Sequence, residues 1–93
     1  MTEKARAHLI VSGRVQGVCF RAETQRAAMH LGVSGWVKNR RDGTVEAEVE
    51  GDKPDVLSLI EWCRKGPAVA RVDDVQVTWE SYGGLWGAFD IRF

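Results

Sequence analysis

A glycine-punctuated segment near the start of the chain has the composition of an anion-binding loop. Between a predicted strand and a predicted helix it reads Gly13-Arg14-Val15-Gln16-Gly17-Val18-Cys19-Phe20-Arg21. The N–H groups of a helix's first turn point out of the helix end, and the helix dipole adds positive potential there. Glycines let the backbone curl into a concave nest of such donors. The segment therefore predicts a site for a phosphate-like anion.

Arg21 strengthens this interpretation. Many strand-to-helix turns contain glycine and bind nothing, and this one is neither a Walker loop nor a Rossmann fingerprint. A fixed cation at the start of a helix is opposed by the helix dipole, however, and a bound anion would reverse the sign of that interaction. The guanidinium of Arg21 also offers a planar fork of donors that matches two phosphate or carboxylate oxygens.

The strands that must hold this loop follow from alternating apolar residues. We expect them at residues 7–13, 34–40, 44–50, 75–79 and 89–93. Asp42-Gly43 is typical of a hairpin turn, so the second and third strands should pair. In the third strand Glu46, Glu48 and Glu50 alternate with valine and alanine, which predicts one solvent-exposed face.

Two helices follow from apolar residues at helical spacing. The first begins at Phe20, runs to Leu31 and is expected to end at Gly32. The second is expected to be capped by Asp52 and to end at Gly66-Pro67. Its predicted buried stripe is Val56, Leu59, Ile60 and Cys63.

The predicted element order is β-α-β-β-α-β plus a short C-terminal strand. This order is typical of an α+β, ferredoxin-like sandwich, with two helices on one face of a mixed, mostly antiparallel sheet. A chain of 93 residues has room for one core, so we expect a single domain over residues 1–93.

The chain resembles the acylphosphatase family through two separate motifs. Residues 13–21 look like that family's signature loop. The stretch Gly35-Trp36-Val37-Lys38-Asn39, followed by Gly43-Thr44-Val45 and Gly51, is similar to its second signature in residue type and spacing. The likeness extends to the ending Phe89-Asp90-Ile91-Arg92-Phe93, although the family commonly has tyrosine at the last position.

The resemblance implies a hydrolase that cleaves acyl phosphates to a carboxylate and inorganic phosphate, without a metal, a cofactor or a covalent intermediate. It implies that Arg21 holds the substrate phosphate and that Asn39 positions the attacking water. The residues whose backbone amides would cradle the phosphate are Gln16, Gly17, Val18, Cys19 and Phe20. Residue types alone support the cradle and Arg21, whereas Asn39 could equally bond neighbouring backbone near the hairpin. Because the second strand of such a sheet runs parallel to the first, Asn39 is expected at the same end as the loop.

Metal chemistry has little support in the sequence. His8 and His30 stand alone, and the glutamates of residues 44–50 leave that strand's outer face as the one conceivable divalent-ion site. His8 is also expected on the exposed face of the sheet. We therefore expect no metal and no cofactor.

Cys19 raises the alternative of a phosphatase with a cysteine nucleophile, because a helix N-terminus favours such chemistry. Those enzymes have C-x5-R spacing, however, and Arg21 follows Cys19 by two residues. We expect Cys19 to line the loop and Cys63 to fill the core. Whether the two cysteines pair is left open.

Composition limits the partners. Lys plus Arg and Asp plus Glu each count 13, so there is no net positive charge to attract nucleic acid or a membrane surface. The sequence has no apolar stretch typical of a signal peptide or a membrane span. We expect a cytoplasmic monomer that binds acyl phosphate as substrate and inorganic phosphate as product or inhibitor.

Two rival functions remain. Ferredoxin-like folds also serve as RNA-binding or ligand-sensing domains, but the strand expected at 44–50 lacks the aromatic and basic residues that RNA recognition requires. The second rival is a regulatory or carbamoyl-phosphate-processing domain of larger maturation proteins that resembles this family. We expect the end of the chain at Phe93 to argue against this second rival.

Overall fold

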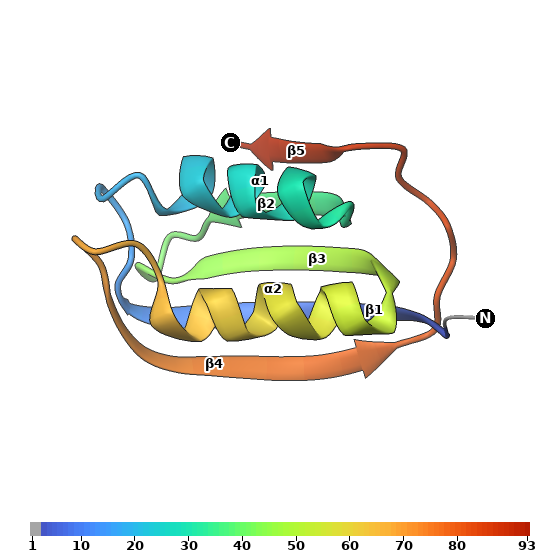
Figure 1. Cartoon of the computed structure of the whole chain (residues 1–93). Coiled ribbons are helices and arrows are strands. Elements are labelled where there is room, and N and C mark those ends of the chain that lie inside the picture. Colours follow the sequence, from blue (N-terminus) through green and yellow to red (C-terminus); the bar gives the residue numbers. More distant parts are fainter. Residues whose placement is uncertain (1–2) are drawn as a thin grey trace.

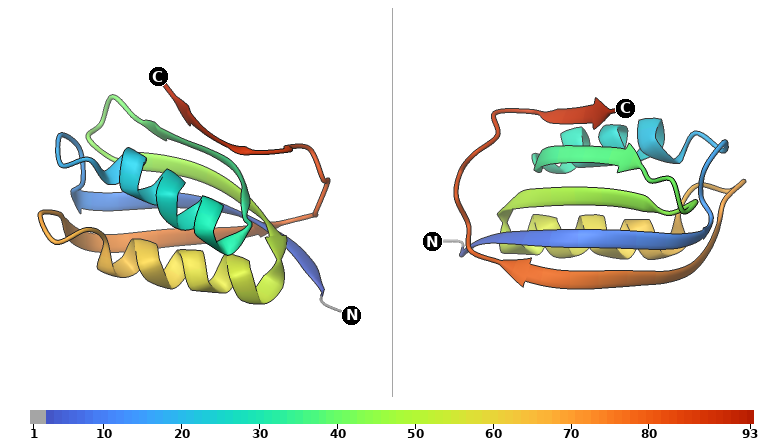
Figure 2. Two further views of the ribbon diagram at one scale, coloured as in Figure 1. Left: turned by 45° about the horizontal axis from the view of Figure 1, so that its top comes forward. Right: turned by 180° about the vertical axis from the view of Figure 1, so that it is seen from behind.

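The computed structural model describes residues 3–93, and its elements follow the predicted order. Helices α1 and α2 lie together on one face of a five-stranded sheet (Figures 1 and 2). The elements are β1 (Lys4–Arg14), α1 (Phe20–Leu31), β2 (Ser34–Asn39), β3 (Val45–Asp52), α2 (Lys53–Lys65), β4 (Arg71–Glu80) and β5 (Phe89–Arg92). The predicted α+β, ferredoxin-like sandwich is therefore confirmed.

The sheet topology brings several chain ends together. The strand order is β4-β1-β3-β2-β5, and all neighbours are antiparallel except β2 and β5. Because β3 is antiparallel to both β1 and β2, the latter two run in the same direction, and β5 runs with them. The C-terminal ends of β1, β2 and β5 thus lie at one end of the sheet, beside the start of α1 (Figure 1).

The core lies between the sheet and the two helices, and the predicted periodicities explain it. Ala7, Leu9 and Val11 of β1 face the helices and are buried. From α2, the predicted stripe Val56, Leu59, Ile60 and Cys63 is buried. Burying a side chain of this size stabilises the fold by about 1.5–3 kcal/mol. Where the helices meet, the rings of Phe20 and Trp62 lie 5.7 Å apart between centroids.

The turns largely follow their expected chemistry. The Asp42 carboxylate accepts hydrogen bonds from the hydroxyl of Thr44 at 2.6 Å and from its backbone N–H at 3.0 Å. These bonds close the predicted β2–β3 hairpin and lower the pKa of Asp42. At the first helix's end, Gly32 is the C-cap as predicted, with its N–H bonded to the Met29 carbonyl at 3.3 Å.

The prediction for the start of the second helix is only partly right. Asp52 occupies the N-cap position of α2, but its side chain makes no capping hydrogen bond. Its carboxylate instead accepts a hydrogen bond of 2.5 Å from the Lys4 ammonium at the start of β1. The nearby cation therefore replaces the helix N–H groups as partner of the carboxylate.

The predicted solvent-exposed face of β3 is wrong. Glu48 is only 6% exposed and Glu50 only 2%. The cause is the connection between the two edge strands β4 and β5: its Trp86 donates a backbone hydrogen bond of 3.3 Å to Glu50 Oε1. The Trp86 ring lies 4.8 Å from the Arg6 guanidinium on the same face. His8, also expected to be exposed, is half-buried against Glu46 at 2.6 Å.

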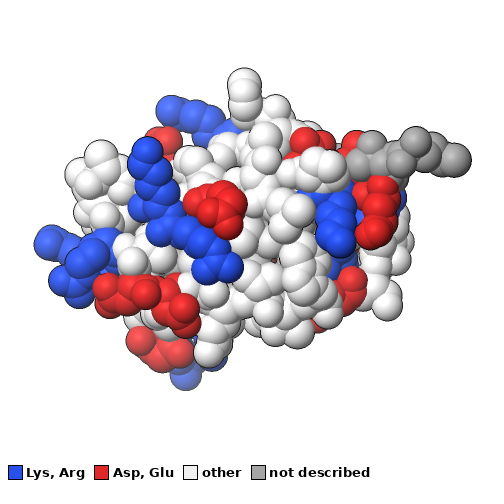
Figure 3. Space-filling view, turned by 60° about the horizontal axis from the view of Figure 1, so that its bottom comes forward, with Lys and Arg blue, Asp and Glu red and all other residues white. Residues whose placement is uncertain are grey.

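The surface combines charges of both signs. On the face shown in Figure 3, basic and acidic side chains lie interspersed among uncharged ones. Many are paired across short distances, as Arg71 is with Asp73 at 3.2 Å. Within the described residues, neither helix is long and apolar enough to cross a membrane.

Candidate active site

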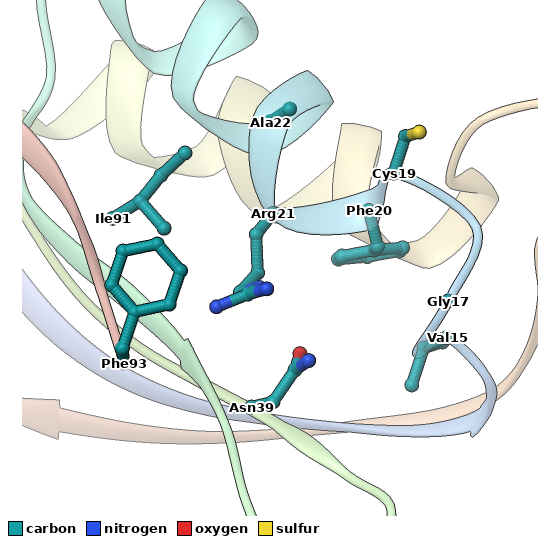
Figure 4. A pocket seen from close by; sticks show the side chains of 9 residues that line it. All are labelled: Val15, Gly17, Cys19, Phe20, Arg21, Ala22, Asn39, Ile91 and Phe93. Atoms are coloured by element: carbon teal, nitrogen blue, oxygen red, sulfur yellow. The ribbon is translucent and has the colours of Figure 1, made fainter.

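A cavity of about 370 Å³ opens where β1, β2 and β5 end and α1 begins. Figure 4 shows the side chains around it, with Arg21 and Asn39 on its opposite walls and pointing toward one another. The residues that line it are Val15, Gly17, Cys19, Phe20, Arg21, Ala22, Asn39, Ile91 and Phe93. The structure thus brings Arg21, which the residue pattern singled out, together with Asn39, which the family resemblance implied.

The loop between β1 and α1 is curled by two residues in the left-handed region. Gly17 has φ 73° and Cys19 has φ 61°, and Cys19 is the one non-glycine residue with positive φ in the described chain. For a residue with a Cβ this conformation costs about 1–2 kcal/mol. Such strain collects at functional sites, where the surrounding structure enforces it.

The loop's backbone donors are free. In residues 3–93, no hydrogen bond outside regular helix and strand pairing uses an N–H of residues 16–20. The first turn bond of α1 is made by Glu23, whose N–H donates to the Cys19 carbonyl at 3.0 Å. The N–H groups ahead of it belong to the helix end, where they lack intrahelical partners and the dipole is positive. This is the arrangement that binds an anion.

Arg21 projects from the first turn of α1 and is oriented by the C-terminal strand. Its Nη1 donates to the Arg92 carbonyl oxygen at 3.3 Å, and its guanidinium lies 4.9 Å from the centre of the Phe93 ring. None of the ion pairs in the described chain joins Arg21 to a carboxylate. Its charge is therefore held in place without being neutralised.

Asn39 is the last residue of β2 and is half-buried. Its pairing with Val45 of β3 places it on the helix-covered face of the sheet, as Val45 belongs to the core. Its side chain makes no hydrogen bond to another described residue, so the alternative of bonding nearby backbone is not realised. In Figure 4 the amide points into the space below the Arg21 guanidinium. It is free to donate to one ligand and accept from another.

Gln16 has a side-chain contact that the sequence did not reveal. Its Nε2 donates to the carbonyl oxygens of Arg40 at 2.7 Å and Thr44 at 2.9 Å. These bonds tie the loop to the hairpin that directly follows Asn39. The sequence offered no signal for them, because they depend on where the hairpin lies in space.

Ile91 and Phe93 of the C-terminal segment also line the cavity and were not predicted as site residues. Their position follows from the parallel pairing of β5 with β2, which sets Val37 opposite Ile91. The sequence did offer a signal for Phe93, because the last residue is aromatic, as is the tyrosine that the family commonly has there.

The structure also places the two cysteines and the possible metal ligands. The Cys19 side chain is exposed, and its sulfur points away from Arg21 and Asn39 in Figure 4. Cys63 is buried in the core, so both thiols are free and unpaired with each other. Among residues 3–93, no three His, Cys, Asp or Glu side chains gather in a way that could hold a metal ion.

Comparisons with known proteins agree with this geometry. The acylphosphatase family model matches residues 7–91. A curated acylphosphatase of Anaeromyxobacter sp. (strain Fw109-5) is 56% identical over 92 residues, which cover 99% of each chain. The crystal structure of acylphosphatase from Bacillus subtilis superposes with a TM-score of 0.92 at 37% identity, covering 96% of this chain and 99% of that one.

A third similarity concerns a larger protein. The crystal structure of HypF from T. kodakarensis contains a matching region with a TM-score of 0.83 and 32% identity, but that region covers only 12% of the HypF chain. The match is thus to one small part of that protein, whereas the curated relative is matched along nearly its whole length. On the family match, the full-length identity and the shared fold, this chain belongs to the acylphosphatase family.

Proposed function

We propose that this chain hydrolyses acyl phosphates to a carboxylate and inorganic phosphate, with Arg21 gripping the phosphoryl group and Asn39 holding the attacking water. One observation carries the proposal. The Arg21 guanidinium and the Asn39 amide face a single cavity, and the wall beside them is a loop whose N–H groups have no acceptor within residues 3–93.

The phosphoryl group is bound by charge and by main-chain donors. The amides of Gln16, Gly17, Val18, Cys19 and Phe20 cradle its oxygens, and the Arg21 fork adds a cation beside them. Phosphoryl transfer commonly has a loose transition state with charge spread over the equatorial oxygens. Donors that are already oriented toward those oxygens stabilise this charge without reorganising.

The water is oriented rather than deprotonated. The Asn39 amide can accept a hydrogen bond from the water and donate one to a phosphoryl oxygen. The water oxygen forms a bond to phosphorus while the bond from phosphorus to the acyl oxygen breaks. The electron pair leaves with a carboxylate whose conjugate acid has a pKa near ~4, so no general acid is required. The proton released by the water ends on phosphate or in solvent.

The setting of the activity follows the same reasoning. We infer that residues 1–93 act as one domain and as a monomer in the cytoplasm, without a cofactor, a metal, nucleic acid or a membrane. A single hydrophobic cluster links the sheet to both helices, which supports one domain. The zero net charge and the two free thiols fit a reducing compartment and a small-molecule substrate.

Hydrolysis of benzoyl phosphate by the purified protein, with a chelator present, tests the proposal. We expect metal-independent turnover in the unmodified protein. Arg21→Ala should lose both phosphate inhibition and turnover, whereas Asn39→Ala should bind phosphate, remain folded and turn over at least about 100-fold more slowly, as for loss of one preorganised transition-state contact.

Arg26→Ala provides the matched control, because Arg26 lies on the same helix but pairs with Glu23 at 3.6 Å outside the cavity. It should keep its turnover. Full activity in both Arg21→Ala and Asn39→Ala would refute the proposed roles. Tight phosphate binding without any turnover in the unmodified protein would instead indicate a sensing domain.

A further inference from the structure

The face of the sheet away from the helices carries three carboxylates around one guanidinium. Arg6 Nη2 lies 3.0 Å from Glu48 Oε1, and Arg6 Nε lies 3.3 Å from Glu80 Oε1. Glu50 sits directly opposite Arg6 in the pairing of β1 with β3. Arg6 cannot neutralise all three groups, because it supplies a single positive charge.

Two of these carboxylates have a buried oxygen without a partner. Glu48 Oε2 and Glu50 Oε2 are both shielded from solvent, and neither accepts a hydrogen bond in the described chain. A buried ionised oxygen without a donor is strongly unfavourable, and proteins commonly avoid it by keeping the group neutral. The cluster therefore needs a positive partner or a proton.

The geometry between Glu48 and Glu80 identifies the proton. Both carboxyl groups contact the same Arg6 guanidinium, which brings them close enough for a hydrogen bond between them. Ionised carboxylates are acceptors only, so this bond exists only when one of the two is protonated. Burial first, and then the Glu80 carboxyl, raise the pKa of Glu48 from the ordinary 4.5 to about 7, although Arg6 acts in the opposite direction.

The other charged groups on this face do not supply the missing cation. His8, which is opposite Glu48, contacts Glu46 at 2.6 Å, and Lys38 lies 3.6 Å from the same carboxylate. The Arg92 guanidinium lies over the Trp36 ring at 4.8 Å. By strand register and chain position, the titratable or charged groups around Glu48 are Arg6 and His8 on β1, Lys38 on β2, Glu46 and Glu50 on β3, Glu80 on β4, Asp90 and Arg92 on β5, and Tyr82 in the connection that follows β4.

The cluster also holds the connection between the two edge strands. Residues 81–88, here called the strap, run from β4 around the end of the sheet to β5 (Figures 1 and 2). The strap's Trp86 is fixed by its stacking on Arg6 at 4.8 Å and by its N–H bond to Glu50 at 3.3 Å. Arg6 is thus shared between the carboxylates and the strap.

We propose that a proton on Glu48 bridges it to Glu80 beside Arg6, and that this proton fastens the strap to the sheet. With the proton present, the Glu48–Glu80 pair carries one negative charge, and the Arg6 guanidinium remains stacked on the Trp86 ring. Loss of the proton leaves Glu48 and Glu80 both ionised beside the buried Glu50. The repulsion between these carboxylates opens the strap. The strap leads into β5, which supplies the Arg92 carbonyl that orients Arg21.

The sign of the pH dependence follows directly. The fastened form binds the proton more tightly than an open form in which Glu48 has its ordinary pKa. Fastening is therefore strongest below that ordinary value, weakens as pH rises and reaches its minimum above about 7. One released proton changes the opening equilibrium by up to about tenfold per pH unit in this range.

Two NMR measurements on the full chain test the proposal. The side-chain carboxyl carbon of Glu48 should titrate near neutral pH, well above the ordinary range of glutamate. The protection factor of the Trp86 amide, corrected for the intrinsic pH dependence of exchange, should fall severalfold or more between about pH 5 and pH 8. Titration of Glu48 in the ordinary range of glutamate would overturn the proposal.

Matched variants separate the proton from other effects. Glu48→Gln supplies a permanent donor to Glu80, so the protection of Trp86 should become independent of pH and remain high at pH 8. Glu46→Gln, a change two residues away on the same face, should keep the pH dependence of the unmodified protein. A pH dependence that persists unchanged in Glu48→Gln would also overturn the proposal. The titration in the unmodified protein decides the matter if either variant fails to fold.

Discussion

Gln16 and Arg40 are joined across 24 positions of sequence: the Gln16 side-chain amide donates to the Arg40 carbonyl oxygen at 2.7 Å. The same nitrogen donates to the Thr44 carbonyl at 2.9 Å. Arg40 follows Asn39 directly, so this one side chain fixes the distance between the curled loop and the strand end that carries the proposed water-binding amide.

Replacing Gln16 with leucine should therefore lower kcat/KM more than it lowers stability. Two carbonyl oxygens near the surface lose a donor, which costs about 1 kcal/mol in the free energy of unfolding. A shift between loop and hairpin misplaces the reacting groups and can cost about 100-fold in rate. Steady-state kinetics and urea unfolding measure the two effects, with the exposed Gln76→Leu as control. A loss of stability at unchanged kcat/KM would contradict the positioning role.

Gly35→Ala should be among the most damaging single substitutions in the chain. A Cβ at Gly35 would lie 1.8 Å from the Glu48 carbonyl oxygen, and its φ is +139°. Because the obstacle is the backbone of the neighbouring strand, we expect a loss of at least about 3 kcal/mol. Gly87→Ala is the control, since a Cβ there meets no atom within 4 Å. Urea unfolding of both variants checks the prediction, and equal stabilities would contradict it.

Cys19→Gly should keep both its fold and its turnover. Glycine relieves the left-handed strain at φ 61° but adds flexibility to the unfolded chain, so the two effects nearly cancel. Cys19→Val should be destabilised by about 1–2 kcal/mol, because a β-branched side chain tolerates this conformation poorly. Thermal unfolding and benzoyl phosphate hydrolysis measure the outcomes. Abolished turnover in a folded Cys19→Gly protein would revive the cysteine-nucleophile mechanism.

Thiol labelling should distinguish the two cysteines. Burial raises the pKa of the Cys63 thiol to about 12 and encloses it in the core, whereas Cys19 is exposed. Because the thiolate is the reactive form, Cys63 should resist alkylation at about pH 8. Mass spectrometry should find one label per native chain and two labels in denaturant. Rapid double labelling of the native protein would show that the α2 side of the core opens readily.

Much of the fold could be predicted because its signals are local. Alternation in β1 and the helical stripe of α2 each report which side of one element faces the core. The position of Asn39 beside the loop followed from topology alone, since parallel strands end together. The anion-binding role proposed for residues 13–21 was likewise suggested by glycines and one arginine, whose physical effects do not require distant partners.

The misjudged features depend on distant partners. Alternation correctly set Glu48 and Glu50 on the face away from the helices, but it carries no information on whether Trp86 covers that face. Asp52 has the residue type of a helix cap, yet Lys4, which binds it, lies 48 positions earlier. The sequence placed Gln16 in the loop. Its hydrogen bonds to Arg40 and Thr44 could not be predicted without knowing where the hairpin lies in space.

The parallel course of β1, β2 and β5 has a practical consequence for protein engineering. Any tag or fusion partner joined after Phe93 would begin at the edge of the cavity. It would lie next to the Arg21 guanidinium, which the Arg92 carbonyl oxygen orients. One attached ahead of Lys4 would start from the opposite pole of the molecule. Kinetic work should accordingly use amino-terminal fusions, whereas a carboxy-terminal extension would test whether obstructing this cavity blocks the proposed reaction.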